Sequence, residues 1–295
     1  MDVVTRESLG RVGIWSLGLG STAADATRRT EIAEAVAELD ELGYGTLWLG
    51  GSPSVADAAA VLAATRRITV ATGILSIWDH TPHDVAAQVA ALEEEAPGRF
   101  VLGLGVSHSV VTPRYTRPYT SMVEYLDALD GAPVPVPRGR RVLAALGPKM
   151  LALAGDRTLG AHPYLVTAEH TAQARTVLGP DALLAPELKV VLDTDLDRAR
   201  ALAHQALAFY LRVPNYVGNL RRLGFKEDEL TGGGADRVVD ALFALGDAGQ
   251  AAARVREHLE AGADHVSVQV VTEGAPGGSP PRAQWRELAA ALPLR

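Results

Sequence analysis

The sequence predicts a single domain over residues 1–295 with the (β/α)8 architecture of a TIM barrel. Strand-like and helical runs alternate from end to end, and each parallel strand connection needs a crossover helix. The length suits one such barrel. Residues 213–246 break the alternation with glycine and proline, and we interpret them as a helical insertion between the seventh and eighth strands. An open doubly wound sheet is the alternative, because strand order is not readable from the sequence.

Eight short runs rich in β-branched and apolar residues predict the strands. In order they are Val12–Ser16, Gly45–Leu49, Ile68–Ile74, Phe100–Val106, Val142–Leu146, His162–Val166, Leu183–Leu192 and His265–Val271.

Helical periodicity and capping residues predict the segments between these strands. Gly43 stands where a helix C-cap glycine belongs, and Ser54 and Thr167 stand at N-caps. The run Thr81–Asp84 places threonine at the N-cap and proline in the first turn. Further helices are expected over 121–129, from Pro148, and over 195–211, 248–260 and 282–292.

Composition excludes several classes of function. The chain is 47% hydrophobic and 21% charged, with a net charge of -7, which argues against nucleic acid as a partner. It has no cysteine, so disulfides, thiolate metal sites and a cysteine nucleophile are excluded. No apolar run approaches the ~18 residues that span a bilayer, and no apolar leader opens the sequence. We therefore expect a cytoplasmic protein with no membrane partner.

In a barrel the active site lies at the C-terminal ends of the strands, so the residues just after each strand are the candidates. Those residues are rich in glycine, aromatic side chains and histidine, and they contain no cluster of metal ligands. A flat, partly apolar slot of this kind suits a ring cofactor. His108 and His80 are the candidate proton donors or acceptors, although either could be a surface or capping histidine. Trp15, Ser16 and Trp78 are the candidate substrate contacts, and the tryptophans could equally be core residues.

Two charged features follow later strands. Gly147-Pro148-Lys149-Met150 opens a helix, so its free N–H groups and Lys149 could seat a phosphate, although a simple turn with proline in the first helical turn explains it equally well. Glu187 and Lys189 lie two apart on a strand and share a face. We expect them to form an ion pair inside the barrel.

The chain resembles the luciferase-like superfamily of flavin and deazaflavin enzymes over nearly its whole length. The most specific segment is Pro97–Gly105, which is similar to the family pattern P-x-R-F-x-L-G-x-G. Segments 37–48 and 68–74 resemble the family's second unit and third strand. Gly105–His108, segment 122–130 and Gly147–Leu151 resemble an actinobacterial subgroup that uses coenzyme F420, a 5-deazaflavin.

The resemblance implies the cofactor contacts. It places a non-prolyl cis peptide at Gly73-Ile74 behind the ring, and a hydrogen bond from Ser76 to the ring. It places Gly105, Val106 and Ser107 along the ring edge. The phosphate and tail would be held by the remaining matched residues: Gly147, Pro148, Lys149, Met150, His162, Pro163 and Tyr164.

The sequence also departs from the family pattern. Gly50-Gly51 stand where sugar-phosphate dehydrogenases of the superfamily carry Asp-His, and His108 stands where they carry a glutamate, so glucose 6-phosphate is not the expected substrate. The expected activity is F420-dependent hydride transfer to or from a small organic substrate, by a homodimer. An FMN-dependent monooxygenase and a barrel that only binds a ligand are the alternatives, and no metal is expected.

Overall fold

The sheet consists of parallel strands joined by helices, as the alternation in the sequence predicts. The computed structural model describes residues 6–20, 25–274 and 277–294. Over these residues the strands are β1 Val12–Ser16, β2 Thr46–Leu49, β3 Thr69–Thr72, β4 Leu75–Ser76, β5 Phe100–Gly105, β6 Arg141–Leu143, β7 Gly160–Ala161, β8 Leu183–Leu184, β9 Glu187–Leu192, β10 Phe243–Gly246 and β11 Val266–Val270.

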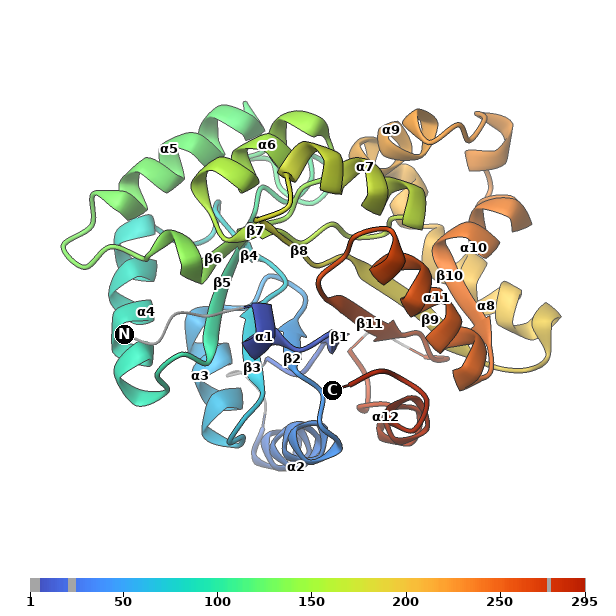
Figure 1. The fold of residues 1–295 in the computed structure, drawn as a ribbon, viewed down its shortest axis with the longest axis horizontal. Helices are drawn as coiled ribbons and strands as arrows, with labels where there is room; N and C mark the ends of the chain where they lie inside the picture. Colours follow the sequence, from blue (N-terminus) through green and yellow to red (C-terminus); the bar gives the residue numbers. More distant parts are fainter. Residues whose placement is uncertain (1–5, 21–24, 275–276, 295) are drawn as a thin grey trace.

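Helices surround this sheet: the longer ones stand around its outside, and the short α1 lies at the centre of the view in front of the strands (Figure 1). They are α1 Arg6–Leu9, α2 Ala26–Leu42, α3 Val55–Ala63, α4 Pro82–Glu95, α5 Pro118–Asp130, α6 Pro148–Arg157, α7 Ala168–Leu178, α8 Leu196–Leu207, α9 Pro214–Arg222, α10 Asp236–Leu242, α11 Ala248–Glu260 and α12 Arg282–Ala289. Three short 3-10 turns are η1 Arg138–Arg140, η2 Tyr210–Arg212 and η3 Asp228–Leu230.

The strand order shows how the sheet curls. Neighbouring strands follow the path β10-β9-β11-β1-β2-β3-β5-β6-β7-β8, all parallel, with β4 beside β5. β8 and β9 are two parts of one run, separated only by Ala185-Pro186, so β7 and β11 lie against the same stretch of chain. The sheet therefore curls round on itself as in a TIM barrel, and the open doubly wound alternative is wrong.

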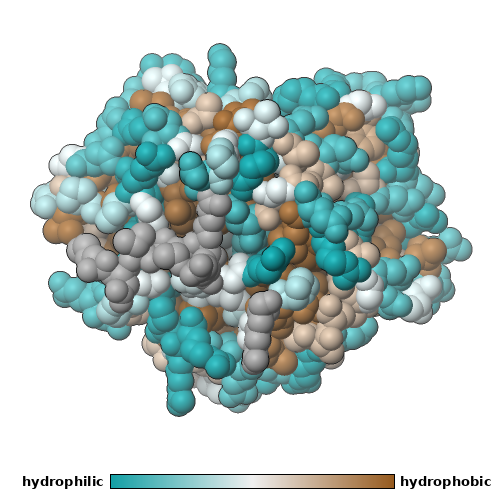
Figure 2. Space-filling model, viewed as in Figure 1, coloured by the Kyte–Doolittle hydropathy of each residue, from teal (hydrophilic) through white to brown (hydrophobic). Residues whose placement is uncertain are grey.

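Side chains of alternate strand residues fill the inside and the outside of this sheet. Trp48, Ala71, Val101, Val142 and Leu183 come from five strands and form one inner cluster with Leu9, Trp15 and Ala185. Their sequence neighbours belong to the larger core that packs against the helices. A separate core lies beneath α8, α9 and α10. Hydrophilic side chains cover most of the outer face seen in Figure 2.

Several capping predictions are confirmed. Gly43 closes α2 with a left-handed φ of 90°. Ser54 and Asp57 form a capping box on α3, and Thr81 and Thr167 cap α4 and α7. These side chains accept hydrogen bonds from backbone N–H groups that have no partner inside the helix. The capping residues thereby fix where each helix begins.

Some predicted boundaries were wrong. The sixth strand, β7, ends at Ala161, so His162–Val166 follows the strand and does not form it. Pro186 lacks an N–H, and the seventh strand is interrupted there. Segment 213–246 was predicted to be helical, but besides α9, η3 and α10 it contains β10, which pairs with β9.

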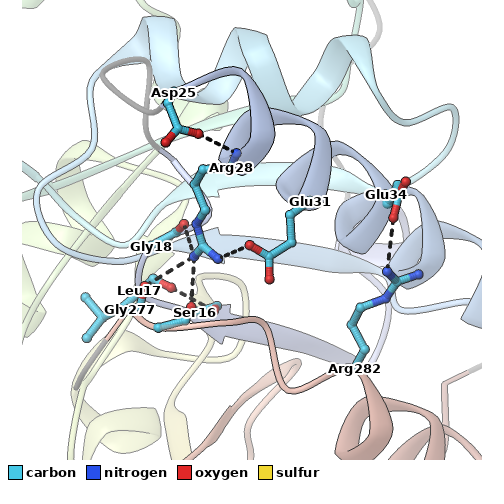
Figure 3. Close-up of polar contacts among 10 residues, drawn as sticks. Ser16, Leu17, Gly18, Asp25, Arg28, Glu31, Glu34, Gly277 and Arg282 are labelled. Carbon is cyan, nitrogen blue, oxygen red and sulfur yellow. Dashed lines mark hydrogen bonds and ion pairs between the residues drawn. The ribbon is translucent and has the colours of Figure 1, made fainter. Parts of the chain in front are cut away.

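The connections after β1 and β11 are tied together at the end of the barrel where the strands terminate. Arg28 of α2 donates hydrogen bonds to the carbonyls of Gly18 and Gly277 at 3.2 Å and of Gly278 at 2.8 Å (Figure 3). A Cβ on Gly18 would lie 2.6 Å from the carbonyl oxygen of Gly277, so only glycine allows this approach.

Candidate functional site

A cavity of about 940 Å³ opens at the C-terminal ends of the strands. One side, called here the strand-end wall, consists of the lining residues at or after the C-terminal ends of β1 to β7: Trp15, Leu17, Gly51, Ser52, Gly73, Ile74, Ser76, Gly105, Val106, Ser107, His108, Ala144, Ala145, Leu146, Gly147, Pro148, Lys149, Met150, His162 and Tyr164. The other side, called here the 209–222 wall, consists of Phe209, Tyr210, Pro214, Asn215, Tyr216, Gly218 and Arg222. The rim between them carries Val111, Tyr115, Pro118 and Tyr119.

Most of the sequence-predicted site residues meet in this cavity. Of the predicted cofactor contacts, twelve of thirteen line it, and Pro163 does not. His108 and Trp15 also line it. Their roles toward a ligand stay predictions, but residues 15 to 164, far apart in the chain, surround one space.

Three other predicted residues lie elsewhere. Ser16 Oγ donates to the carbonyl of Leu17, and Trp78 Nε1 donates to the carbonyl of Val106 from outside the lining. His80 lines a second hollow of about 330 Å³ with residues of the α4 N-terminus. His80 lies four residues after β4 and directly before Thr81, the N-cap of α4, so it belongs to the start of that helix.

Glycines bring backbone and side chains into close contact on the strand-end wall. Trp15 Nε1 donates to the carbonyl of Gly73 at 3.0 Å, and a Cβ on Gly73 would lie 2.8 Å from that nitrogen. The Gly73-Ile74 peptide is cis, as the resemblance implies. The side chain of Ile74 packs over Gly105, where a Cβ would lie 2.4 Å from Ile74 Cδ1. At Gly73 and Gly105 the wall therefore has no room for a side chain.

Two serines on the same wall adopt left-handed backbone conformations. Ser52 has a φ of 59° and Ser107 a φ of 54°. Residues other than glycine and asparagine seldom adopt such positive values. Ser52 Oγ accepts a hydrogen bond from the N–H of Ser76 at 3.2 Å. Such conformations concentrate at ligand sites, where the surrounding structure enforces them.

His108 joins the two walls. Its ring lies 5.0 Å from that of Tyr216, and Asn215 Nδ2 lies 3.5 Å from its Nδ1. Burial lowers the pKa of His108 below its ordinary value of 6.5. The imidazole is therefore neutral at pH 7, with one nitrogen able to accept a proton.

The N-terminus of α6 carries positive potential at one end of the cavity. Gly147 occupies its N-cap without a side-chain hydrogen bond, so the first N–H groups of the helix remain available. Lys149 is exposed beside them, and Arg222 Nη2 would lie 3.9 Å from a Cβ on Gly147. These groups together can bind an anion.

His162 lies at the base of the cavity with one nitrogen unused. Its Nδ1 lies 2.7 Å from the carbonyl oxygen of Ala185, which places the proton on Nδ1, and its ring stacks on Trp48 at 4.1 Å. Burial lowers the pKa of His162 to about 4, so the ring is neutral. Nε2 is buried and has no hydrogen-bond partner among the described residues. It is an acceptor that lacks a donor.

Sequence reasoning missed the 209–222 wall. Segment 209–222 was divided between a predicted helix and a predicted insertion, and no site was assigned to it. The signal that could have found it is the clustering of three aromatic residues, Phe209, Tyr210 and Tyr216, around Pro214. Aromatic side chains gathered in a connecting segment are typical of ligand sites.

Two kinds of feature are absent from the described residues. No group of three or more His, Cys, Asp or Glu side chains in ranges 6–20, 25–274 and 277–294 is placed to hold a metal ion. Over the same ranges, no helix has the length and apolar character needed to cross a bilayer.

The sequence is similar to known monooxygenases. A family model described as luciferase-like monooxygenase matches residues 11–265. The chain is 38% identical over 88 residues to 4-hydroxyprotoasukamycin monooxygenase of Streptomyces nodosus subsp. asukaensis, covering 26% of this chain and 23% of that protein. It is 30% identical over 130 residues to N-acetyl-S-alkylcysteine monooxygenase of Bacillus subtilis, covering 38% of each. The matches thus span well under half of these relatives.

Solved structures resemble the whole chain. An F420-dependent tetrahydromethanopterin reductase from Methanopyrus kandleri superposes with a TM-score of 0.75 at 18% identity, covering 96% of this chain and 98% of that one. An F420-dependent secondary alcohol dehydrogenase in complex with an F420-acetone adduct gives 0.73 at 14%, covering 97% and 98%. The oxygenating constituent of 3,6-diketocamphane monooxygenase of Pseudomonas putida in complex with FMN gives 0.66 at 13%, covering 96% and 98%. At these identities the likeness concerns the fold.

Proposed function

Because this chain belongs to the luciferase-like monooxygenase family of oxidoreductases, we propose that it is an F420-dependent enzyme of that family. In this proposal a hydride passes between C5 of the deazaflavin and a small organic substrate. One observation carries the proposal: twelve residues that the resemblance assigns to the cofactor line one cavity.

The cavity's own chemistry fits a flavin-type ring. Its volume, about 940 Å³, lies near the upper end of the range of small-molecule sites. The α6 N-terminus, with Lys149 and Arg222 nearby, suits the phosphate of a cofactor tail.

The residues divide into those that would hold the cofactor and those that face the substrate. Gly73, Ile74, Gly105 and Val106 would contact the ring, and Gly147 to Met150 the phosphate. A bound deazaflavin would supply the hydride chemistry. The protein orients the reacting partners and excludes water from between them.

His108 is the residue we assign to proton exchange with the substrate. It lines the cavity, and burial keeps its imidazole neutral at pH 7. A neutral imidazole accepts a proton from a substrate hydroxyl, and the imidazolium formed in this way can return the proton in the reverse direction. Asn215, near Nδ1, orients the ring.

An FMN-dependent monooxygenase is the second candidate. It is favoured by the names of the two curated relatives, both monooxygenases, and by the FMN complex among the similar structures. The cavity would hold either cofactor, because its volume suits a ring and the α6 N-terminus suits a phosphate, and both cofactors carry these two groups.

A binding titration separates the candidates. We expect oxidised F420 to bind the purified protein at least about tenfold more tightly than FMN, a difference of ~1.4 kcal/mol, followed by fluorescence. Tighter binding of FMN would favour the monooxygenase. Binding of neither cofactor would refute both and favour a barrel that only binds a ligand.

A further inference from the structure

A chain of buried polar groups runs behind the cavity and joins its two walls. Glu187 and Lys189 on β9 are 0% and 1% exposed and form the predicted ion pair, with Lys189 Nζ 2.8 Å from Glu187 Oε1. Glu187 Oε2 accepts the N–H of Leu165 at 3.0 Å, just after Tyr164. Glu187 thus ties β9 both to Lys189 and to this part of the strand-end wall.

The chain continues from Lys189 to the 209–222 wall. Lys189 Nζ lies 2.9 Å from Oε1 of Gln269 on β11, and the hydroxyl of Tyr164 lies 2.7 Å from the same oxygen. The hydroxyl of Tyr164 also lies 2.8 Å from that of Tyr210. Tyr164 and Tyr210 both line the cavity, one on each wall.

The ammonium of Lys189 sets the direction of every hydrogen bond in this chain. An ammonium can only donate, so the Gln269 atom that faces it is the carbonyl oxygen. That oxygen can only accept, so the hydroxyl of Tyr164 donates its single proton to Gln269. Tyr164 can then only accept from Tyr210.

The hydroxyl of Tyr210 is left as an acceptor. Its proton points at Tyr164, and within the part of the chain that the structure describes its oxygen has no other hydrogen bond. Burial raises the pKa of Tyr164 well above its ordinary value, so Tyr164 keeps the proton that this order requires. The lone pairs of Tyr210 therefore remain available to a molecule in the cavity.

Aromatic rings surround this acceptor. Phe209 lies 5.4 Å and Tyr216 5.3 Å from the Tyr210 ring, centroid to centroid, both nearly edge to face. Val111 on the rim of the same cavity is 57% exposed. The space around Tyr210 thus suits an apolar or aromatic body rather than a charged one.

We propose that Tyr210 selects substrates that present an O–H or N–H donor on an apolar or aromatic body, and that Lys189, Gln269 and Tyr164 impose this choice. Naming the selected molecule a substrate rests on the proposed function. The hydrogen-bond preference itself does not require a cofactor.

The test measures binding of phenol and of anisole, in which the donor proton is replaced by methyl. Dissociation constants are determined by ligand-observed NMR on the full chain, with and without saturating F420. We expect phenol to bind the unmodified protein about 3- to 10-fold more tightly than anisole, the size of one neutral hydrogen bond. Equal affinities, or binding of neither probe, overturn the proposal.

Three variants test the assigned direction. Tyr210→Phe should abolish the preference for phenol. Tyr164→Phe removes the group that fixes the Tyr210 proton, so Tyr210 should also donate, and the affinity for acetophenone should rise about 3- to 10-fold. Tyr119→Phe removes a hydroxyl from the rim of the same cavity and should change neither ratio. An unchanged acetophenone affinity in a folded Tyr164→Phe protein contradicts the assigned direction.

The two proposals can fail separately. If the preference for phenol and the rise in acetophenone affinity in Tyr164→Phe are both observed but neither F420 nor FMN binds, the acceptor site stands and the proposed function is wrong. If F420 binds tightly but phenol and anisole bind equally, the proposed function stands and the selection by Tyr210 is wrong.

Discussion

The two walls of the cavity are built from different parts and in different ways. The strand-end wall lies at the ends of the strands, and its glycines allow close contacts that a Cβ would prevent. The 209–222 wall is formed by aromatic and polar side chains on short helical turns. A wall that close backbone contacts hold rigid suits a cofactor, which is the same molecule in every turnover. A wall of side chains suits the recognition of a particular substrate. The variants below test this division.

The largest effect is expected where the two walls are joined. Lys189→Met leaves the carboxylate of Glu187 buried without its partner, which costs ~3–5 kcal/mol in the free energy of unfolding. Urea unfolding at pH 7 measures this loss. Lys149→Met is the matched control, because Lys149 is exposed and its loss should change stability by at most ~0.5 kcal/mol. Similar stabilities of the two variants would show that the buried pair does not hold the walls together.

His108 lies where the walls meet, so its loss should affect turnover rather than cofactor binding. His108→Ala should lower kcat at least ~100-fold, a typical contribution of general acid-base catalysis, with the cofactor Kd nearly unchanged. His80→Ala, outside the cavity, is the control and should keep its activity. Equal turnover by the two variants would remove His108 from the reaction.

The pH profile tests the same residue without a substitution. Burial lowers the pKa of His108 below 6.5, so the neutral form predominates at pH 7 and is lost only as the pH falls below that value. If the neutral form is the working base, kcat/KM stays level from pH 8 to about 6.5 and declines in more acidic solution. A rate that already rises as the pH falls through 7 would indicate the charged form instead.

A side chain at Gly73 should disturb the strand-end wall. The Cβ of Gly73→Val would lie 2.8 Å from Trp15 Nε1 and 3.3 Å from Trp48 Cβ, and overpacking of this kind costs ~1–3 kcal/mol. If the cofactor ring rests on this wall, its Kd should rise about 5- to 150-fold in a fluorescence titration. Gly131→Val, at the end of α5, meets nothing closer than 3.5 Å and serves as control. Unchanged affinity in a folded Gly73→Val protein would place the ring elsewhere.

The strand-end wall could be predicted from the sequence because its position follows from local patterns. Period-two runs mark the strands, and in a barrel the residues after them share one end. The cis peptide at Gly73-Ile74 came from family resemblance. His80 shows the limit of this rule. The rule predicts at which end of the barrel a residue lies, but it does not predict the direction in which the chain leaves the strand.

The 209–222 wall could not be predicted in the same way. Its helical turns are short, and Tyr210 is positioned by contacts with Tyr164 and, through it, Gln269, which lie 46 and 59 positions away in the chain. No local pattern encodes such contacts. The strand β10 was missed for a related reason: its four residues between two helices are too few to show a period, and pairing with β9 makes them a strand.

The smallest effect should have the opposite sign, and it comes from the 209–222 wall. Gly218 lies inside α9, where glycine costs ~0.5–1 kcal/mol relative to alanine because its unfolded chain has more freedom to lose. A Cβ there would meet only Arg222 Nη1, at 3.8 Å. Gly218→Ala should therefore raise the free energy of unfolding by about that amount in urea. In Gly103→Ala on β5 a Cβ would lie 1.9 Å from the carbonyl oxygen of Thr72, so that variant should lose stability. A loss in both variants would mean that the 209–222 wall is as closely packed as the strands, and that its side chains have no freedom to adapt to a substrate.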